Sequence, residues 1–111
     1  MALKKIFEKV SLVVPIEQRR FLNSFEDSVS ELEAMYGKYV FRDKESYKPP
    51  ESIDDEIAVR ELFYPAIVDN VLYLSGKEEV YKSEFLRKAH EAYLKYWNED
   101  IKGRKLRKAV R

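Results

Sequence analysis

The hydrophobic positions recur at helical spacing over most of the chain. Residues 2–10 carry apolar side chains three and four positions apart, separated by charged ones, which predicts a short amphipathic helix. A second helix is predicted to begin at or just after Pro15, whose fixed φ suits a first helical position, and to end at about Tyr36, before Gly37. Its apolar stripe consists of Leu22, Phe25, Val29, Leu32 and Tyr36.

A break in this pattern follows the second helix. Residues 38–42 are β-prone and predict a short extended piece, and the polar residues 43–52 predict a long loop. Pro49 and Pro50 have no N–H to donate and disfavour a helix before them, so we expect the loop to be held open. The loop is either an arm that reaches a partner or a plain surface connection.

Two more helices are predicted in the second half. Ser52 with Asp55 three positions later resembles a capping box, which predicts a helix that starts nearby and ends at Ser75 and Gly76. Pro65 inside it predicts either a kink or two segments, the second starting at the proline. The last helix should run from Lys77 to about Ile101. Its broad stripe is Phe85, Leu86, Ala89, Ala92, Tyr93, Tyr96 and Trp97.

The predicted fold class is therefore mainly α, a small four-helix bundle with one extended loop and a short β-like segment. A chain of 111 residues is expected to form one domain, here residues 1–101, with the loop at about 43–52. Only three glycines and four prolines are present, which argues against an all-β sandwich.

Composition excludes several classes of protein. The absence of cysteine rules out a disulfide scaffold, a cysteine-based zinc site, an iron–sulfur cluster and a thiol nucleophile. The longest apolar runs have four residues, far short of the roughly 20 that span a bilayer. Charged residues soon after Met1 also give no expectation of a secretory leader.

Catalytic patterns are missing as well. His90 is the only histidine, and neither Glu-x-x-His nor His-Glu-x-x-His spacing occurs. The acidic cluster that includes Asp54 and Asp55 lacks the order of a calcium loop and suits the start of a helix. No Gly-x-Ser-x-Gly and no glycine-rich phosphate loop is present. We predict no enzymatic activity, no cofactor and no metal site.

Charge is distributed unevenly. The predicted C-terminal tail, residues 102–111, has six bases and no acid, whereas the rest of the chain holds 15 bases and 20 acids. The six bases are Lys102, Arg104, Lys105, Arg107, Lys108 and Arg111. Such a tail is expected to meet nucleic acid or an acidic protein surface, although cations also favour the C-terminal end of a helix without any partner.

Aromatic residues interleaved with a base near the end of the last helix suggest one alternative. Tyr93, Lys95, Tyr96 and Trp97 are residue types that stack on nucleobases and neutralise phosphate. At helical spacing the same aromatic residues also suit a core. A small helical nucleic-acid-binding or regulatory protein therefore remains the alternative interpretation.

The order of elements resembles a known family. The resemblance is carried by residues 25–32 (FEDSVSEL), 36–40 (YGKYV), 62–74 (LFYPAIVDNVLYL) and 85–97, from Phe85 to Trp97. Across about residues 16–101 the chain is similar to the small head-tail connector (adaptor) proteins of tailed bacteriophages. The similarity lies in helix order and apolar pattern.

This resemblance implies a mechanical function. Members form a helical bundle with an extended loop and assemble as a ring, typically a dodecamer, which docks on the portal protein. It implies a virion protein of the neck, made in the host cytoplasm, with a stopper or tail completion protein beyond it. DNA would pass through its channel without sequence-specific binding, and no membrane is involved. The residues implied to bind the portal or a neighbouring subunit are the six bases of 102–111 with Tyr47, Lys48, Pro49 and Pro50.

Overall fold

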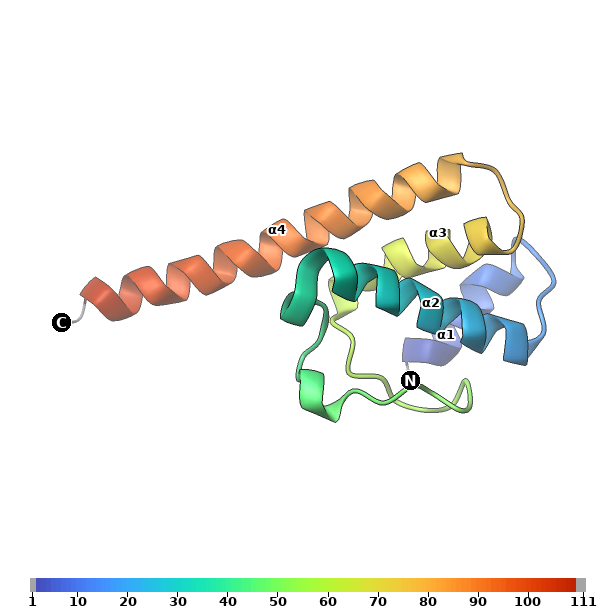
Figure 1. The fold of residues 1–111 in the computed structure, drawn as a ribbon, viewed down its shortest axis with the longest axis horizontal. Helices are drawn as coiled ribbons and strands as arrows, with labels where there is room; N and C mark the ends of the chain where they lie inside the picture. The colour runs from blue at the N-terminus through green and yellow to red at the C-terminus, as the bar shows by residue number, and fades with distance from the viewer. Residues whose placement is uncertain (1, 110–111) are drawn as a thin grey trace.

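Four α-helices make up most of the protein (Figure 1). This computed structural model describes residues 2–109 of the chain, with side chains over 3–103. The helices are α1 (Ala2–Ser11), α2 (Gln18–Tyr36), α3 (Tyr64–Leu74) and α4 (Val80–Ala109). Short 3-10 turns occupy Gly37–Val40, Lys44–Ser46 and Glu61–Phe63. The prediction of a mainly α, four-helix fold is confirmed.

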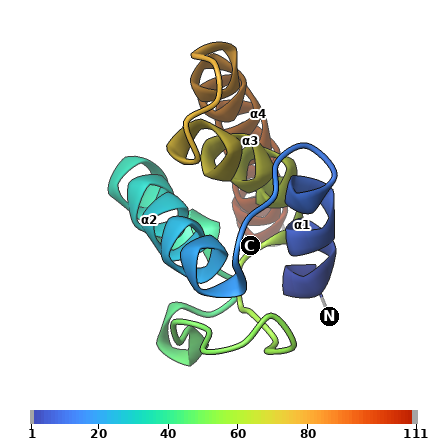
Figure 2. The same ribbon diagram turned by 90° about the vertical axis from the view of Figure 1, so that its right-hand side faces the viewer.

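Helix α3 is the centre of the core. It packs against α1, α2 and α4, and Figure 2 shows it surrounded by them in end view. Ala66, Ile67 and Val71 are fully buried, so burial extends well around the helix, as expected for a central element. Pro65 lies in the first turn, where its missing N–H costs nothing. After α3, Gly76 has a φ of 89°, a conformation that glycine adopts without strain.

The first two helices follow the predicted pattern with small shifts. Helix α1 matches its prediction and buries Leu3, Ile6 and Val10. Helix α2 begins at Gln18, slightly later than Pro15, and ends where Gly37 adopts a φ of 58°. Its buried face is turned slightly from the predicted stripe, because Phe21 is fully buried and Leu22 only partly so. The ring of Phe21 reaches further than a leucine side chain and packs edge-on against the ring of Phe7, with 5.1 Å between the ring centres.

The segment between α2 and α3 departs most from prediction. Part of the predicted extended piece is a 3-10 turn, and the only β-type pairing described is a bridge between Phe41 and Val59. The predicted helix near Ser52 is wrong. Half of the capping box does form, because the Asp55 carboxylate accepts from the Ser52 N–H, whereas the Ser52 hydroxyl accepts from the Asp54 N–H and not from that of Asp55. These hydrogen bonds close a turn and do not start a helix, because the side chains of Ile53 and Ile57 are buried in the core.

Helix α4 begins at Val80 and continues past Ile101 to Ala109, so the backbone of the predicted tail is largely helical. Phe85, Ala89 and Ala92 bury its first half against the core. The second half projects beyond the body, and the molecule measures 55 × 28 × 21 Å (Figure 1). No described helix combines the length and the apolar character needed to span a membrane.

Candidate partner-binding surfaces

The projecting half of α4 carries the predicted basic segment. Its root is held by the Tyr39 hydroxyl, which donates to Asp100 at 2.9 Å, and by Tyr93, whose ring stacks on Tyr36 at 4.7 Å. Lys102 lies beyond these contacts and is exposed. The side chains of Arg104, Lys105, Arg107 and Lys108, and the whole of Arg111, lie outside the described residues. The backbone of this segment continues α4 as far as Ala109.

The predicted loop lies against the body rather than standing open. The Tyr47 hydroxyl donates to the Glu26 carboxylate at 2.6 Å, and its ring packs on Phe41 at 4.9 Å. Lys44 forms an ion pair with Glu33 of α2. Pro49 and Pro50 do not prevent this packing against the body, because the residues that make the contacts precede them in the chain. The prediction that the loop is held open is therefore wrong at Tyr47. Lys48 and Pro49 are exposed, and Pro50 is half-buried.

Acidic residues around the loop are used within the chain. Asp55 accepts from the N–H groups of Glu51 and Ser52 at 2.8 and 3.1 Å. Over the residues that the structure describes, no three metal-binding side chains come together. His90 is exposed and lies beside Tyr36 and Tyr93, each 6.4 Å away between ring centres.

The aromatic set proposed for nucleic-acid stacking is divided by the structure. Tyr93 stacks on Tyr36, and Tyr96 stacks on Phe63 at 5.8 Å while Arg60 covers its ring at 4.5 Å. The faces of both tyrosines are therefore already in contact with the body. Trp97 alone of these aromatic residues is substantially exposed, at 38%. No flat platform of several free rings remains.

An exposed apolar ridge runs along α4. We define it as Leu86, His90, Leu94 and Trp97, which share an arc of about 80° on the helix surface. The exposed fractions of the two leucines are 43% and 39%. Leu86 and Trp97 had been predicted to join the buried stripe. They lie outside it because the core contacts only the side that carries Phe85 and Ala89.

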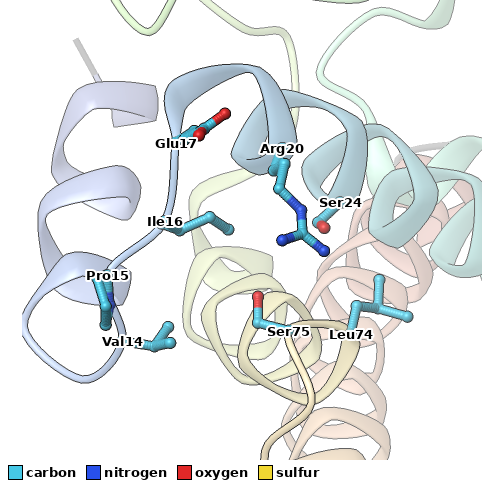
Figure 3. A pocket seen from close by; sticks show the side chains of 8 residues that line it. All are labelled: Val14, Pro15, Ile16, Glu17, Arg20, Ser24, Leu74 and Ser75. Carbon is cyan, nitrogen blue, oxygen red and sulfur yellow. The ribbon is translucent and has the colours of Figure 1, made fainter.

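A pocket of about 490 Å³ lies where the connection between α1 and α2 meets the C-terminal end of α3, at the end of the body away from the projecting half of α4 (Figure 3). This end pocket is lined by Val14, Pro15, Ile16, Glu17, Arg20, Ser24, Leu74 and Ser75. In Figure 3 the Arg20 guanidinium extends over the hollow toward Ser75, whereas Glu17 points away. Leu12 and Val13, just before the pocket in sequence, are 86% and 46% exposed. The apolar run from Leu12 to Val14, which belongs to none of the predicted helical stripes, is the feature of the sequence that leads to this pocket.

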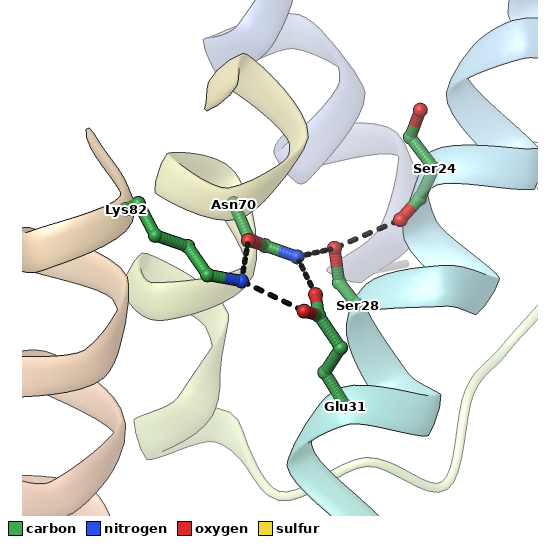
Figure 4. Close-up of polar contacts among 5 residues, drawn as sticks. All are labelled: Ser24, Ser28, Glu31, Asn70 and Lys82. Carbon is green, nitrogen blue, oxygen red and sulfur yellow. Dashed lines mark hydrogen bonds and ion pairs between the residues drawn. The ribbon is translucent and has the colours of Figure 1, made fainter. Parts of the chain in front are cut away.

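A polar network crosses the core beside these surfaces (Figure 4). Buried Asn70 of α3 donates to Ser28 at 2.9 Å and to Glu31 at 2.5 Å, both on α2. Lys82 of α4 donates to Glu31 at 2.7 Å and to the Asn70 side-chain oxygen at 3.3 Å. The network links α2, α3 and α4 through groups that satisfy one another, which is the role expected of buried polar residues.

Burial raises the pKa of several tyrosines. The pKa of Tyr47 lies well above its usual value because the ring is buried and its hydroxyl is bonded to the Glu26 carboxylate. Burial also raises the pKa of Tyr64, despite an opposing hydrogen bond from Arg42, and that of Tyr36. On the surface of α4, a hydrogen bond from Arg87 lowers the pKa of Glu84. None of these groups is tuned to titrate near neutral pH.

Comparison with known protein families, with curated proteins and with solved structures finds no match to this chain. A functional assignment must therefore rest on the residues and surfaces described above.

Proposed function

We propose that the chain is a head-tail adaptor of a tailed bacteriophage, a virion protein that docks on the portal ring. The observation that carries the proposal is helix α4, which continues without a break from the core to Ala109. Its projecting part bears the basic segment that begins at exposed Lys102. A stiff helix with a cluster of positive charge at its end is suited to insertion against an acidic protein surface.

The aromatic contacts favour a protein partner over nucleic acid. A single-strand binder needs several free rings on which bases stack. Tyr93 and Tyr96 are engaged with Tyr36 and Phe63, which leaves only Trp97 substantially exposed. The net charge of the whole chain is only +1. These features support attraction at one end of the molecule rather than broad affinity for phosphate.

Under this proposal the protein works as an assembled ring, a dodecamer when docked, with the portal on one side and a stopper or tail completion protein on the other. The ring extends the DNA channel in the neck of the virion after synthesis of the subunits in the host cytoplasm. Its activity is mechanical, so the proposal assigns no catalytic residue and no cofactor.

The direct test is mass photometry of the purified protein mixed with the portal ring of its phage, beside a mixture with duplex DNA at low salt. A complex with the portal and no shift with DNA is expected. Replacing Lys102, Arg104 and Lys105 by glutamine should weaken portal binding at least about tenfold, because three charges are lost from the projecting end. The matched control replaces Lys4, Lys5 and Lys9, exposed on α1, and should bind as the unmodified chain does.

A mass shift with DNA alone would reject the adaptor proposal and favour the nucleic-acid-binding alternative. In that case binding should fall steeply as salt is raised. Equal losses in the two triple variants would show that net charge alone matters and that the end of α4 has no special role.

A further inference from the structure

Two arginine side chains share a hollow on the surface beside the bridge between Phe41 and Val59. Backbone hydrogen bonds of Arg42 and Arg60, one on each side of this bridge, fix the positions of both residues. The hollow, which we call the arginine pocket, has a volume of about 360 Å³ and is lined by Arg42, Arg60, Glu61 and Tyr96. Two bases and a single acid therefore line a small space.

Arg60 is held in place without an acidic partner. Its Nε donates to the carbonyl of Phe41 at 3.1 Å, and its guanidinium lies over the ring of Tyr96 at 4.5 Å. The side chain is half-buried, and no described acid lies within ion-pair distance of it. Its two terminal nitrogens make no hydrogen bond to a described group. Arginines removed from water are ordinarily paired, so the planar fork of this guanidinium is a fixed set of donors that still lacks its acceptor.

Two neighbours add further donors. One terminal nitrogen of Arg42 donates to the Tyr64 hydroxyl at 3.2 Å, and its other two nitrogens have no described acceptor. The Tyr96 hydroxyl accepts from the Leu62 N–H at 3.1 Å, and its own proton is donated to no described group. Guanidinium and hydroxyl protons that line one space are the donors that a carboxylate or phosphate oxygen accepts.

The acids nearby do not supply that acceptor. The Glu61 side chain is 79% exposed, and its carboxylate lies 4.0 Å from Arg42, the outer limit of an ion pair. A wider hollow of about 610 Å³ shares the two arginines, and its lining holds four bases and four acids. Two of these acids, Asp43 and Asp100, already accept hydrogen bonds from neighbouring side chains. The surroundings are thus neutral overall, which suits one small anion held by the two forks better than a nucleic-acid backbone.

We propose that the arginine pocket binds a single oxyanion of the carboxylate or phosphate class, held by the forks of Arg60 and Arg42 and by the hydroxyl of Tyr96. Planar forks match such groups through paired hydrogen bonds. The volume of about 360 Å³ lies at the lower end of the range of about 300–1,000 Å³ found for small-ligand sites. The inference goes beyond the adaptor proposal and does not rest on it, so either can fail without the other.

Solution NMR of the isotopically labelled chain tests the site. Sodium phosphate and sodium acetate are titrated separately at pH 7 in exchange for sodium chloride, so that ionic strength stays constant. The reporters are the Nε–H signal of Arg60 and the amide signal of Leu62, whose N–H donates to Tyr96. Both signals should shift and saturate with at least one of the two anions. The anion that saturates at the lower concentration identifies the group that the pocket takes.

Variants followed at the Leu62 amide separate the fork from its charge. Arg60→Gln should weaken binding at least about tenfold, because charge-assisted hydrogen bonds are lost. Arg60→Lys keeps the charge without the fork and should weaken binding about fivefold. Glu61→Gln removes the one acid of the arginine pocket and should strengthen binding about threefold.

Arg60 also supports the backbone at Phe41, so a second arginine variant keeps the test independent of misfolding. Arg42→Gln changes a side chain that is 56% exposed and should weaken binding about threefold. The matched controls are Arg19→Gln and Glu8→Gln, which make the same charge changes at exposed positions without a described ion pair and should bind as the unmodified chain does. Shifts that rise linearly with both anions, or Arg42→Gln and Glu61→Gln variants that bind like their controls, would overturn the proposal.

Discussion

At the scale of single residues, the core of this protein depends on charged groups held close to apolar ones. Asp69 of α3 is only 7% exposed, and one of its carboxylate oxygens lies 2.6 Å from the Lys88 ammonium of α4. A carboxylate so far removed from water is tolerated only when it is paired. Lys82 of α4 is paired likewise, because its ammonium donates to the Glu31 carboxylate and to the Asn70 side-chain oxygen. These pairs fix which faces of α3 and α4 meet.

Removal of the Lys88 charge should therefore be costly. Lys88→Met keeps the aliphatic stem and leaves Asp69 unpaired, and should lower the free energy of unfolding by about 2 kcal/mol in urea titrations. The control Lys95→Met removes an exposed lysine with no described ion pair on the same helix and should change it by less than about 0.5 kcal/mol. Adding Asp69→Asn to Lys88→Met should restore part of the loss. If both lysine variants behave alike, the ion pair contributes nothing.

Tyr47 should make the protein sensitive to alkali. Its pKa is raised in the folded state by burial and by its bond to Glu26, so above about pH 10 the folded chain holds a proton that the unfolded chain loses. The free energy of unfolding therefore falls as pH rises through this range. Tyr47→Phe should flatten that fall, with Tyr36 and Tyr64 accounting for the slope that remains. Urea titrations between pH 8 and 11 measure it.

At pH 7 the Tyr47→Phe variant should lose about 2 kcal/mol of unfolding free energy, the contribution of a hydrogen bond to a charged acceptor. Tyr73→Phe serves as control, because the Tyr73 hydroxyl makes no hydrogen bond to any described group. A Tyr47→Phe protein whose alkaline slope matches that of the unmodified chain would contradict the role assigned to this phenol.

At the scale of elements, the helices differ in how firmly the body holds them. Helix α3 is covered by three other helices, whereas α4 is covered along one side of its first half. The segment between α2 and α3 is held by backbone bonds around Phe41 and Val59 and by single side chains such as Tyr47. Local opening costs least where few apolar contacts must be broken.

Hydrogen exchange followed by mass spectrometry should reveal this ranking. Amides of α3 should be the slowest to exchange, and those of residues 48–56 among the fastest. The second half of α4 should exchange faster than its first half because its hydrogen bonds face water on more sides. Binding to a portal or to a second copy should slow exchange in the second half. Exchange in α3 as fast as in residues 48–56 would refute the central position of α3.

At the scale of the whole molecule, helical periodicity predicted the architecture well and the surfaces poorly. The stripe of α1 and the stops at Gly37 and Gly76 follow from local rules and are confirmed, whereas the stripe of α2 holds at Phe25, Val29 and Leu32 but has Phe21 in place of Leu22 in the core. The helix near Ser52 failed because a capping box specifies hydrogen bonds, which a simple turn also satisfies. Tertiary burial of Ile53 and Ile57 decided between the two.

The exposed sides of α4 could not be predicted for a related reason. An apolar stripe indicates that something covers it, but not whether this is the core or another molecule. Leu86 and Trp97 read as core residues because they share helical spacing with Phe85 and Ala89. Only the packing of α4 against α3 shows that the core covers the side with Phe85 and Ala89 and not the side with Leu86 and Trp97. The end pocket likewise combines residues from two stretches that are distant in sequence, 14–24 and 74–75.

The bridge between Phe41 and Val59 has a consequence for how such a chain can change over time. Hydrogen bonds from Arg42 to Ala58 and from Arg60 to Val40, at 2.8 and 2.9 Å, hold the two ends of the intervening segment side by side. Lengthening a loop whose ends are already fixed is inexpensive: doubling it costs about 0.6 kcal/mol of closure entropy. The exposed stretch at Lys48 and Pro49 is thus a tolerant insertion point, where evolution or an engineer can add a new recognition peptide while the helical body keeps its shape.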